Sequence, residues 1–73
     1  MNSEQSNGLE GVTLRFDVTL KDASKLHIYQ IGKEYAICIL GEHEIKSMKF
    51  FSSASGIRKH MKVKYGIKVS IDD

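Results

Sequence analysis

A chain of 73 residues with one cysteine, no proline and a net charge of +2 is long enough for one small domain and too short for two. Its single thiol, Cys38, excludes an internal disulfide and fits a reducing compartment. There is neither a basic, apolar leader nor a run of about 18 apolar residues, so we expect a cytoplasmic protein without membrane contact.

The first eleven residues differ in composition from the rest of the chain. Residues 1–11 are polar, include two glycines and contain only Leu9 as an interior apolar residue. Such a segment buries too little apolar surface to offset its conformational entropy. We therefore expect a flexible N-terminal tail over residues 1–11 and a single small α+β domain over residues 12–73.

Four stretches have the alternation of apolar and polar residues that is typical of strands with one buried face. The clearest runs from Val12 to Leu20, where every second residue is apolar. A two-residue turn at Gly32-Lys33 suits a hairpin, because glycine accepts the positive φ that such turns require. The pattern predicts an antiparallel four-stranded meander, with strands over residues 12–20, 26–31, 35–40 and 45–51.

The stretch after the fourth strand has a helical period. Over residues 52–65 one apolar stripe recurs at steps of three and four, formed by Ala54, Ile57, Met61 and Tyr65. Ser52 or Ser53 suits the N-cap, and Gly66 suits the left-handed residue that ends a helix. Alternation over residues 67–71 predicts a short fifth strand, antiparallel to the first at the sheet edge. The expected order is β-β-β-β-α-β, with the helix on one face of the sheet.

Pairing apolar residues across the turns predicts the register of the sheet. The expected pairs are Leu20–Leu26, Val18–Ile28, Phe16–Gln30, His27–Cys38, Leu40–Ile45, Ile37–Met48 and Tyr35–Phe50. In this register the helix side of the sheet holds the core: Leu14, Phe16, Val18, Leu20, Leu26, Ile28, Tyr35, Ile37, Ile39, Met48 and Phe50.

One helix covers only one face of a sheet, so the other face is open. In the predicted register this open face carries Arg15, Asp17, Thr19, His27, Tyr29, Ile31, Ala36, Cys38, Leu40, Ile45, Ser47 and Lys49. A face that only meets water is normally polar, whereas this one is apolar across three strands. We expect a partner or homodimer contact there, formed by Tyr29, Ile31, Leu40 and Ile45. Scattered exposed apolar side chains are the alternative interpretation.

Few residues have the types and spacing that catalysis or metal binding needs. His27 opposite Cys38 is the one pairing of base and nucleophile, and neither an orienting carboxylate nor an oxyanion donor accompanies it. Cys38, His27 and His43 with a nearby glutamate lack the spacing of a zinc site. No glycine-rich phosphate loop occurs. We expect no enzymatic activity, no catalytic residue, no metal and no cofactor.

Charge is unevenly distributed along the chain. Residues 1–24 carry two basic and four acidic groups, whereas residues 25–73 carry nine basic and five acidic ones. Between positions 46 and 68 every charged residue is basic: Lys46, Lys49, Arg58, Lys59, Lys62, Lys64 and Lys68. Basic surfaces of this kind neutralise phosphates. Tyr29 and Tyr65 offer rings on which bases can stack.

Our leading hypothesis is a non-enzymatic binding module that contacts nucleic acid through these seven basic residues, without strong sequence preference. An acidic protein surface is the other candidate partner, and an ordinary solvated face is the alternative. The second hypothesis is a protein-interaction or inhibitor domain of mobile-element type, which docks through the open face or forms a homodimer there. The layout is similar to small sheet-plus-helix modules with either role, a likeness of fold alone.

Overall fold

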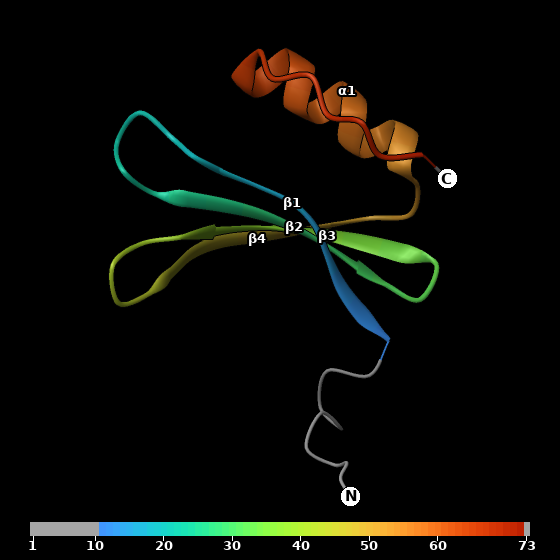
Figure 1. Ribbon diagram of the computed structural model, residues 1–73, viewed down its shortest axis with the longest axis horizontal. Helices are drawn as coiled ribbons and strands as arrows, with labels where there is room; N and C mark the ends of the chain where they lie inside the picture. Colours follow the sequence, from blue (N-terminus) through green and yellow to red (C-terminus); the bar gives the residue numbers. More distant parts are fainter. Residues whose placement is uncertain (1–10, 73) are drawn as a thin grey trace, which may run out of the picture.

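The described part of the chain folds into one antiparallel sheet and one helix. A computed structural model describes residues 11–72. Its elements are β1 (Val12–Thr19), β2 (Lys25–Ile31), β3 (Glu34–Leu40), β4 (Ile45–Phe51) and α1 (Ala54–Tyr65). The strands form one sheet in the order β1-β2-β3-β4, and α1 lies on one side of it (Figure 1). The predicted α+β class and four-stranded meander are confirmed, while residues 1–10 of the expected tail lie outside the described residues.

Tight turns connect the first three strands. Between β1 and β2 the amide of Leu20 donates to the carbonyl of Ser24 (2.8 Å), so the loop closes one residue earlier on each strand than predicted. Ala23 in this loop has φ 74°, the left-handed conformation that ends many three-residue hairpin loops. Between β2 and β3, Gly32 has the expected positive φ, 63°.

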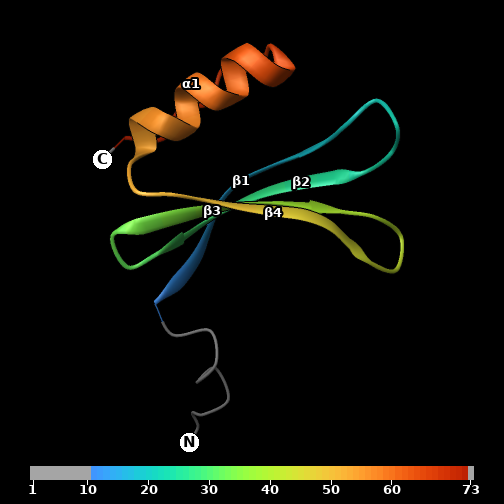
Figure 2. The same cartoon turned by 180° about the vertical axis from the view of Figure 1, so that it is seen from behind.

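Both predicted caps of α1 are present. Ser53 is the N-cap, and its hydroxyl accepts a hydrogen bond from the amide of Gly56 (3.3 Å). Gly66 ends the helix with φ 69°, and its amide donates to the carbonyl of Lys62 (3.0 Å). The buried side of α1 faces the sheet (Figure 2) and carries three residues with no exposed surface: Ala54, Ile57 and Met61.

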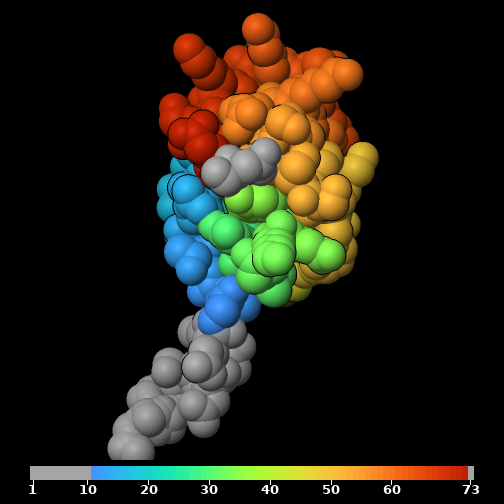
Figure 3. Space-filling model, turned by 90° about the vertical axis from the view of Figure 1, so that its right-hand side faces the viewer, coloured from blue at the N-terminus to red at the C-terminus, as the bar shows by residue number. Residues whose placement is uncertain are grey.

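The core lies between the sheet and a second layer that α1 forms with the segment after it. Its buried members are Leu26, Ile28, Tyr35, Ile37, Ala54, Ile57, Met61, Val69 and Ile71. In the edge view of Figure 3, the orange and red atoms of this second layer sit above the atoms of the strands.

The predicted fifth strand is not formed in the described residues 66–72. This segment runs back beside α1 on the side of β1, without pairing to it (Figure 1). Val69 and Ile71 are buried, and the guanidinium of Arg58 donates to the carbonyl of Ile71. The alternation of residues 67–71 therefore reflects burial against the core, because every second side chain of an extended segment points the same way.

A β-bulge at Arg15 changes the register predicted for β1 and β2. The observed pairs are Val18–Leu26, Phe16–Ile28 and Leu14–Tyr29. The first two are shifted by two residues, which keeps the faces, but the extra residue Arg15 inverts the alternation before Phe16. Leu14, predicted in the core, therefore lies on the open face. Arg15, predicted on the open face, instead donates to the side chain of Gln30 on the helix side.

A second bulge, at Lys46, inverts the alternation of β4. The observed pairs are Leu40–Ile45, as predicted, and then Ile39–Ser47, Cys38–Met48, Ile37–Lys49, Ala36–Phe50 and Tyr35–Phe51. Lys46 is the extra residue between the first two pairs. Met48 and Phe50, both predicted in the core, therefore lie on the open face. Ser47 and Lys49, both predicted on the open face, lie on the helix side.

Ile57→Ala is expected to lower the free energy of unfolding by about 2–5 kcal/mol, because it removes buried methyl groups and leaves a cavity. Val63→Ala is the matched control on the solvent side of α1, where Val63 is 77% exposed, and it should change stability by at most about 0.5 kcal/mol. Urea denaturation followed by circular dichroism measures both. Equal effects of the two substitutions would contradict the placement of α1.

Candidate functional site

The open face carries most of the exposed large apolar side chains of residues 11–72. No described element covers this face, which lies below the sheet in Figures 1 and 2. Six large apolar side chains are exposed, and five share it: Leu14 (46%), Ile31 (41%), Ile45 (60%), Met48 (48%) and Phe50 (61%). The sixth is Val63 on α1. The five come from β1, β2 and β4, whereas the apolar open-face residues of β3 between them are buried or half-buried.

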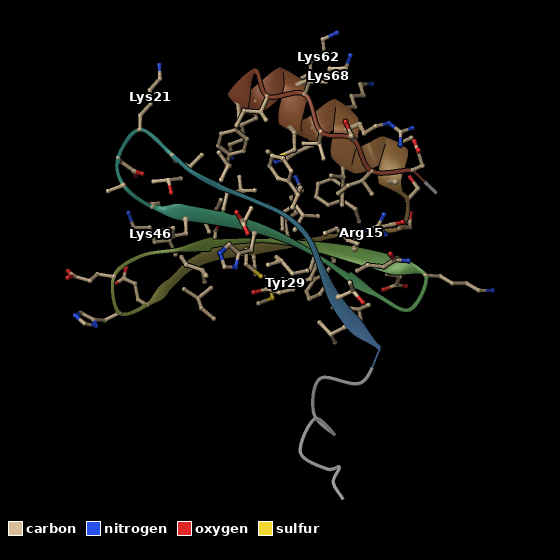
Figure 4. All side chains as sticks on the ribbon, in the orientation of Figure 1. Arg15, Lys21, Tyr29, Lys46, Lys62 and Lys68 are labelled. Atoms are coloured by element: carbon tan, nitrogen blue, oxygen red, sulfur yellow. The ribbon has the colours of Figure 1, made fainter. Side chains whose placement is uncertain are left out.

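The four residues predicted to contact a partner all lie on the open face. Ile31 and Ile45 are exposed, whereas Tyr29 and Leu40 are half-buried. In Figure 4, Tyr29 lies on the side of the sheet away from α1. Ala36, between Tyr29 and Phe50 on the neighbouring strands, is 2% exposed. The smaller side chains of this face are thus covered by the larger ones beside them.

Three residues of the open face were not predicted from the sequence: Leu14, Met48 and Phe50. One signal was available for the last of these. Phe50 and Phe51 are adjacent in one strand, and adjacent strand residues point to opposite faces, so one of the two rings had to leave the core.

The pair of His27 and Cys38 forms as predicted, but it lacks an activated thiol. The two residues lie opposite each other on β2 and β3. Cys38 is 6% exposed, and this burial raises the pKa of its thiol. Nδ1 of His27 lies 2.9 Å from the hydroxyl of Tyr29, which orients the imidazole toward a phenol. Among residues 11–72, no group of three potential metal ligands is found.

Of the seven predicted nucleic-acid contacts, Lys46 is separated from the rest. Its Nζ donates to the hydroxyl of Ser24 (2.8 Å) and lies 3.6 Å from a carboxylate oxygen of Asp22, at the loop between β1 and β2. Asp22 also accepts the amide of Ser24 (2.9 Å). The hydrogen bonds from Ser24, followed by the charge of Lys46, lower the pKa of Asp22. Lys46 is therefore partly neutralised within its own chain.

A basic hollow lies between α1 and the segment that follows it. It encloses about 340 Å³ and is lined by Arg58, Lys62, Gly66, Lys68 and Val69. Lys62 and Lys68 point away from the sheet (Figure 4). Arg58 lies 3.9 Å from a carboxylate oxygen of Asp72, but that side chain is 99% exposed, so water and salt screen the pair. Three cations thus line one hollow without a buried countercharge.

The remaining basic residues of the predicted set surround His60. A shallow hollow of about 310 Å³ on the outer side of α1 is lined by Gly56, Lys59, His60, Val63 and Lys64. The rings of His60 and Phe51 pack with their centroids 5.1 Å apart, and Nζ of Lys49 lies 5.6 Å from the same Phe51 ring. Burial of the imidazole, and then the charges of Lys49 and Lys64, lower the pKa of His60.

The two tyrosines predicted to stack bases lie on opposite sides of the sheet. Tyr29 is on the open face, whereas Tyr65 is half-buried against the core on the helix side. The Nζ atom of Lys64 lies 5.8 Å from the Tyr65 ring. The basic residues of α1 therefore lie on the same side of the sheet as Tyr65 and on the opposite side from Tyr29.

Comparison with known proteins returns no assignment for either surface. No protein-family model, curated protein or solved structure matches this chain. Within the described range, 11–72, no helix is both long and apolar enough to cross a membrane. The open face and the basic hollow are therefore interpreted from their own residues.

His60 is expected to titrate below its ordinary pKa of 6.5, because burial and two nearby lysines disfavour its charged form. Its contribution to stability is then complete above pH 6.5 and is lost as the pH falls from 6.5 toward the lower pKa of the folded state. Lys49→Gln should raise the pKa of His60, whereas Lys33→Gln, in the distant β2–β3 hairpin, should not. A proton NMR titration of the His60 ring measures this shift. Titration at or above pH 6.5 in the wild type would contradict the described surroundings of His60.

Proposed function

We propose that this chain is a small non-enzymatic binding module that contacts nucleic acid through the basic hollow and the neighbouring lysines of α1. The observation that carries the proposal is the hollow itself, which is lined by Arg58, Lys62 and Lys68 and by no acidic residue of the described range 11–72. Phosphates placed there would release condensed counterions, which is the main source of sequence-independent affinity.

The proposed contact surface is smaller than the set that the sequence suggested. It consists of the cations on α1 and on the segment after it: Arg58, Lys59, Lys62, Lys64 and Lys68. Lys46 is left out because of its contacts with Ser24 and Asp22. Lys49 is left out because it lies on β4, with its Nζ atom 5.6 Å from the centre of the Phe51 ring. Contacts to phosphates carry no direct sequence information, so a module that binds through them should have no strong sequence preference.

Reversing two of these charges should weaken binding strongly. Lys59→Glu with Lys62→Glu is expected to reduce the affinity for a mixed nucleic-acid pool by at least about tenfold, and to reduce the slope of log affinity against log salt by about 2. Fluorescence anisotropy between about 50 and 200 mM salt measures both quantities. Circular dichroism checks that the fold is retained, because both side chains are exposed.

The matched control reverses two exposed lysines away from α1, Lys25→Glu with Lys33→Glu, and changes the net charge by the same amount. It should leave the affinity within a few-fold of the wild type. Absence of binding at about 50 mM salt, or an affinity that does not change with salt concentration, would contradict the proposed nucleic-acid binding. Polyglutamate that binds as tightly as nucleic acid would instead favour an acidic protein partner.

A second function, docking of a protein on the open face, is proposed on a different observation. Five of the six exposed large apolar side chains in the described residues share this one face. Monomeric proteins rarely expose contiguous apolar patches larger than a few hundred Å², and larger patches mark contact sites. The open face and the basic hollow lie on opposite sides of the sheet, so the two functions do not compete for the same residues.

We also propose that the protein works in the cytoplasm. Its one thiol, Cys38, is unpaired and buried. Proteins of oxidising compartments more often contain disulfide-bonded cysteines, whereas a single reduced thiol suits a reducing compartment such as the cytoplasm.

A further inference from the structure

The open face combines apolar surface with nearly balanced charge. Its described charged residues are Asp17, Lys25 and Glu34, which pair in register with His27, Leu40 and Ile31. The helix side, by contrast, carries the cations of α1. A surface with a large charge of one sign repels its own copy, and a balanced one does not. Self-association is therefore electrostatically permitted at the open face and opposed at the helix side.

Both edge strands of the sheet have features that disfavour pairing with a strand of another copy. β1 has a bulge at Arg15 and β4 has a bulge at Lys46, so each edge strand is interrupted at a basic residue. Bulges and charged side chains at edge strands are the usual protection against edge-to-edge association. A second copy would thus meet the face of the sheet rather than its edge.

The projected area of the open face lies somewhat below the area that the smallest standard interfaces bury. Four strands of seven or eight residues present a surface of roughly 19 by 23 Å, about 440 Å² in projection. Interfaces at the small end of the standard range bury about 600 Å² of accessible surface on each partner. Accessible area exceeds projected area where large side chains stand out from the sheet, as Phe50 and Ile45 do here at 61% and 60% exposure.

Residues 1–10 are poor in apolar side chains that could match this face. Residues 1–10 contain only Met1 and Leu9 as large apolar residues. Two such side chains cannot match the five exposed ones of the open face, whereas a second copy presents an identical apolar face of identical size.

We infer that the open face is the interface of a homodimer in which two sheets pack face to face. This inference rests on the second function proposed above, protein docking on the open face, and it is independent of nucleic-acid binding. Face-to-face sheets pack about 10 Å apart with their apolar side chains interdigitated. The α1 layers of the two copies then lie on the outside, with their basic hollows facing in opposite directions.

Sedimentation of the wild-type chain, freed of nucleic acid by nuclease, tests the dimer over about 1 μM to 1 mM, the range in which weak interfaces assemble. The weight-average mass should rise from that of one chain, 8.2 kDa, toward twice that value. Phe50→Asp should remain monomeric, or have a dissociation constant at least tenfold higher. Val63→Asp, the matched control on α1, should assemble like the wild type. Mixed isotope labelling should reveal NOEs from Met48 of one copy to the open face of the other.

Four outcomes would overturn the dimer. The first three are a wild-type chain that stays monomeric at 1 mM, an assembly that Phe50→Asp leaves unchanged, and an assembly that is lost on nuclease treatment. The fourth is stronger hydrogen-exchange protection of the outer β4 amides on assembly, because this would indicate that the copies pair edge to edge. If the wild type remains monomeric yet captures a different protein that Phe50→Asp loses, the dimer is wrong while docking on the open face stands. Urea denaturation of each variant confirms that Phe50→Asp, an exposed substitution, remains folded.

Discussion

Two β-bulges, one in each edge strand, determine which side chains of this sheet meet the core and which meet solvent. Strand residues alternate between faces, so one extra residue inverts the sides of everything beyond it. The bulge at Lys46 places Phe51 on the helix side and Phe50 on the open face. The bulge at Arg15 moves Leu14 to the open face as well. Without these two residues the open face would lose three of its five exposed apolar side chains.

The separation of the two faces gives the molecule two chemically different surfaces. On the helix side, α1 and the segment after it cover the core, and the basic hollow lies between them. On the other side, the sheet presents apolar side chains with little net charge. Because the sheet lies between the two surfaces, a partner bound at one of them would not block the other. In a face-to-face dimer the same arrangement would present two basic surfaces, one on each side of the assembly.

Features set by local chemistry could be predicted from the sequence, and features set by distant pairing could not. The strands, the Gly32 turn, and the caps at Ser53 and Gly66 each depend on a few neighbouring residues. A bulge depends on the pairing with the partner strand, and the alternation of apolar and polar residues around Arg15 does not indicate one. Residues 67–71 show a further limit, because an extended segment packed on the core alternates just as a paired strand does. The basic hollow could not be predicted from the sequence either, because it forms only when the fold brings Lys68 back beside α1.

Backbone NOEs between β3 and β4 test the role of the Lys46 bulge most directly. With the bulge, Phe51 lies opposite Tyr35 and Met48 lies opposite Cys38. Cross-strand NOEs that join these two pairs are the expected result. NOEs that join Phe50 to Tyr35 and Met48 to Ile37 would contradict the bulge, return both side chains to the core, and remove the apolar surface from which the open face is interpreted.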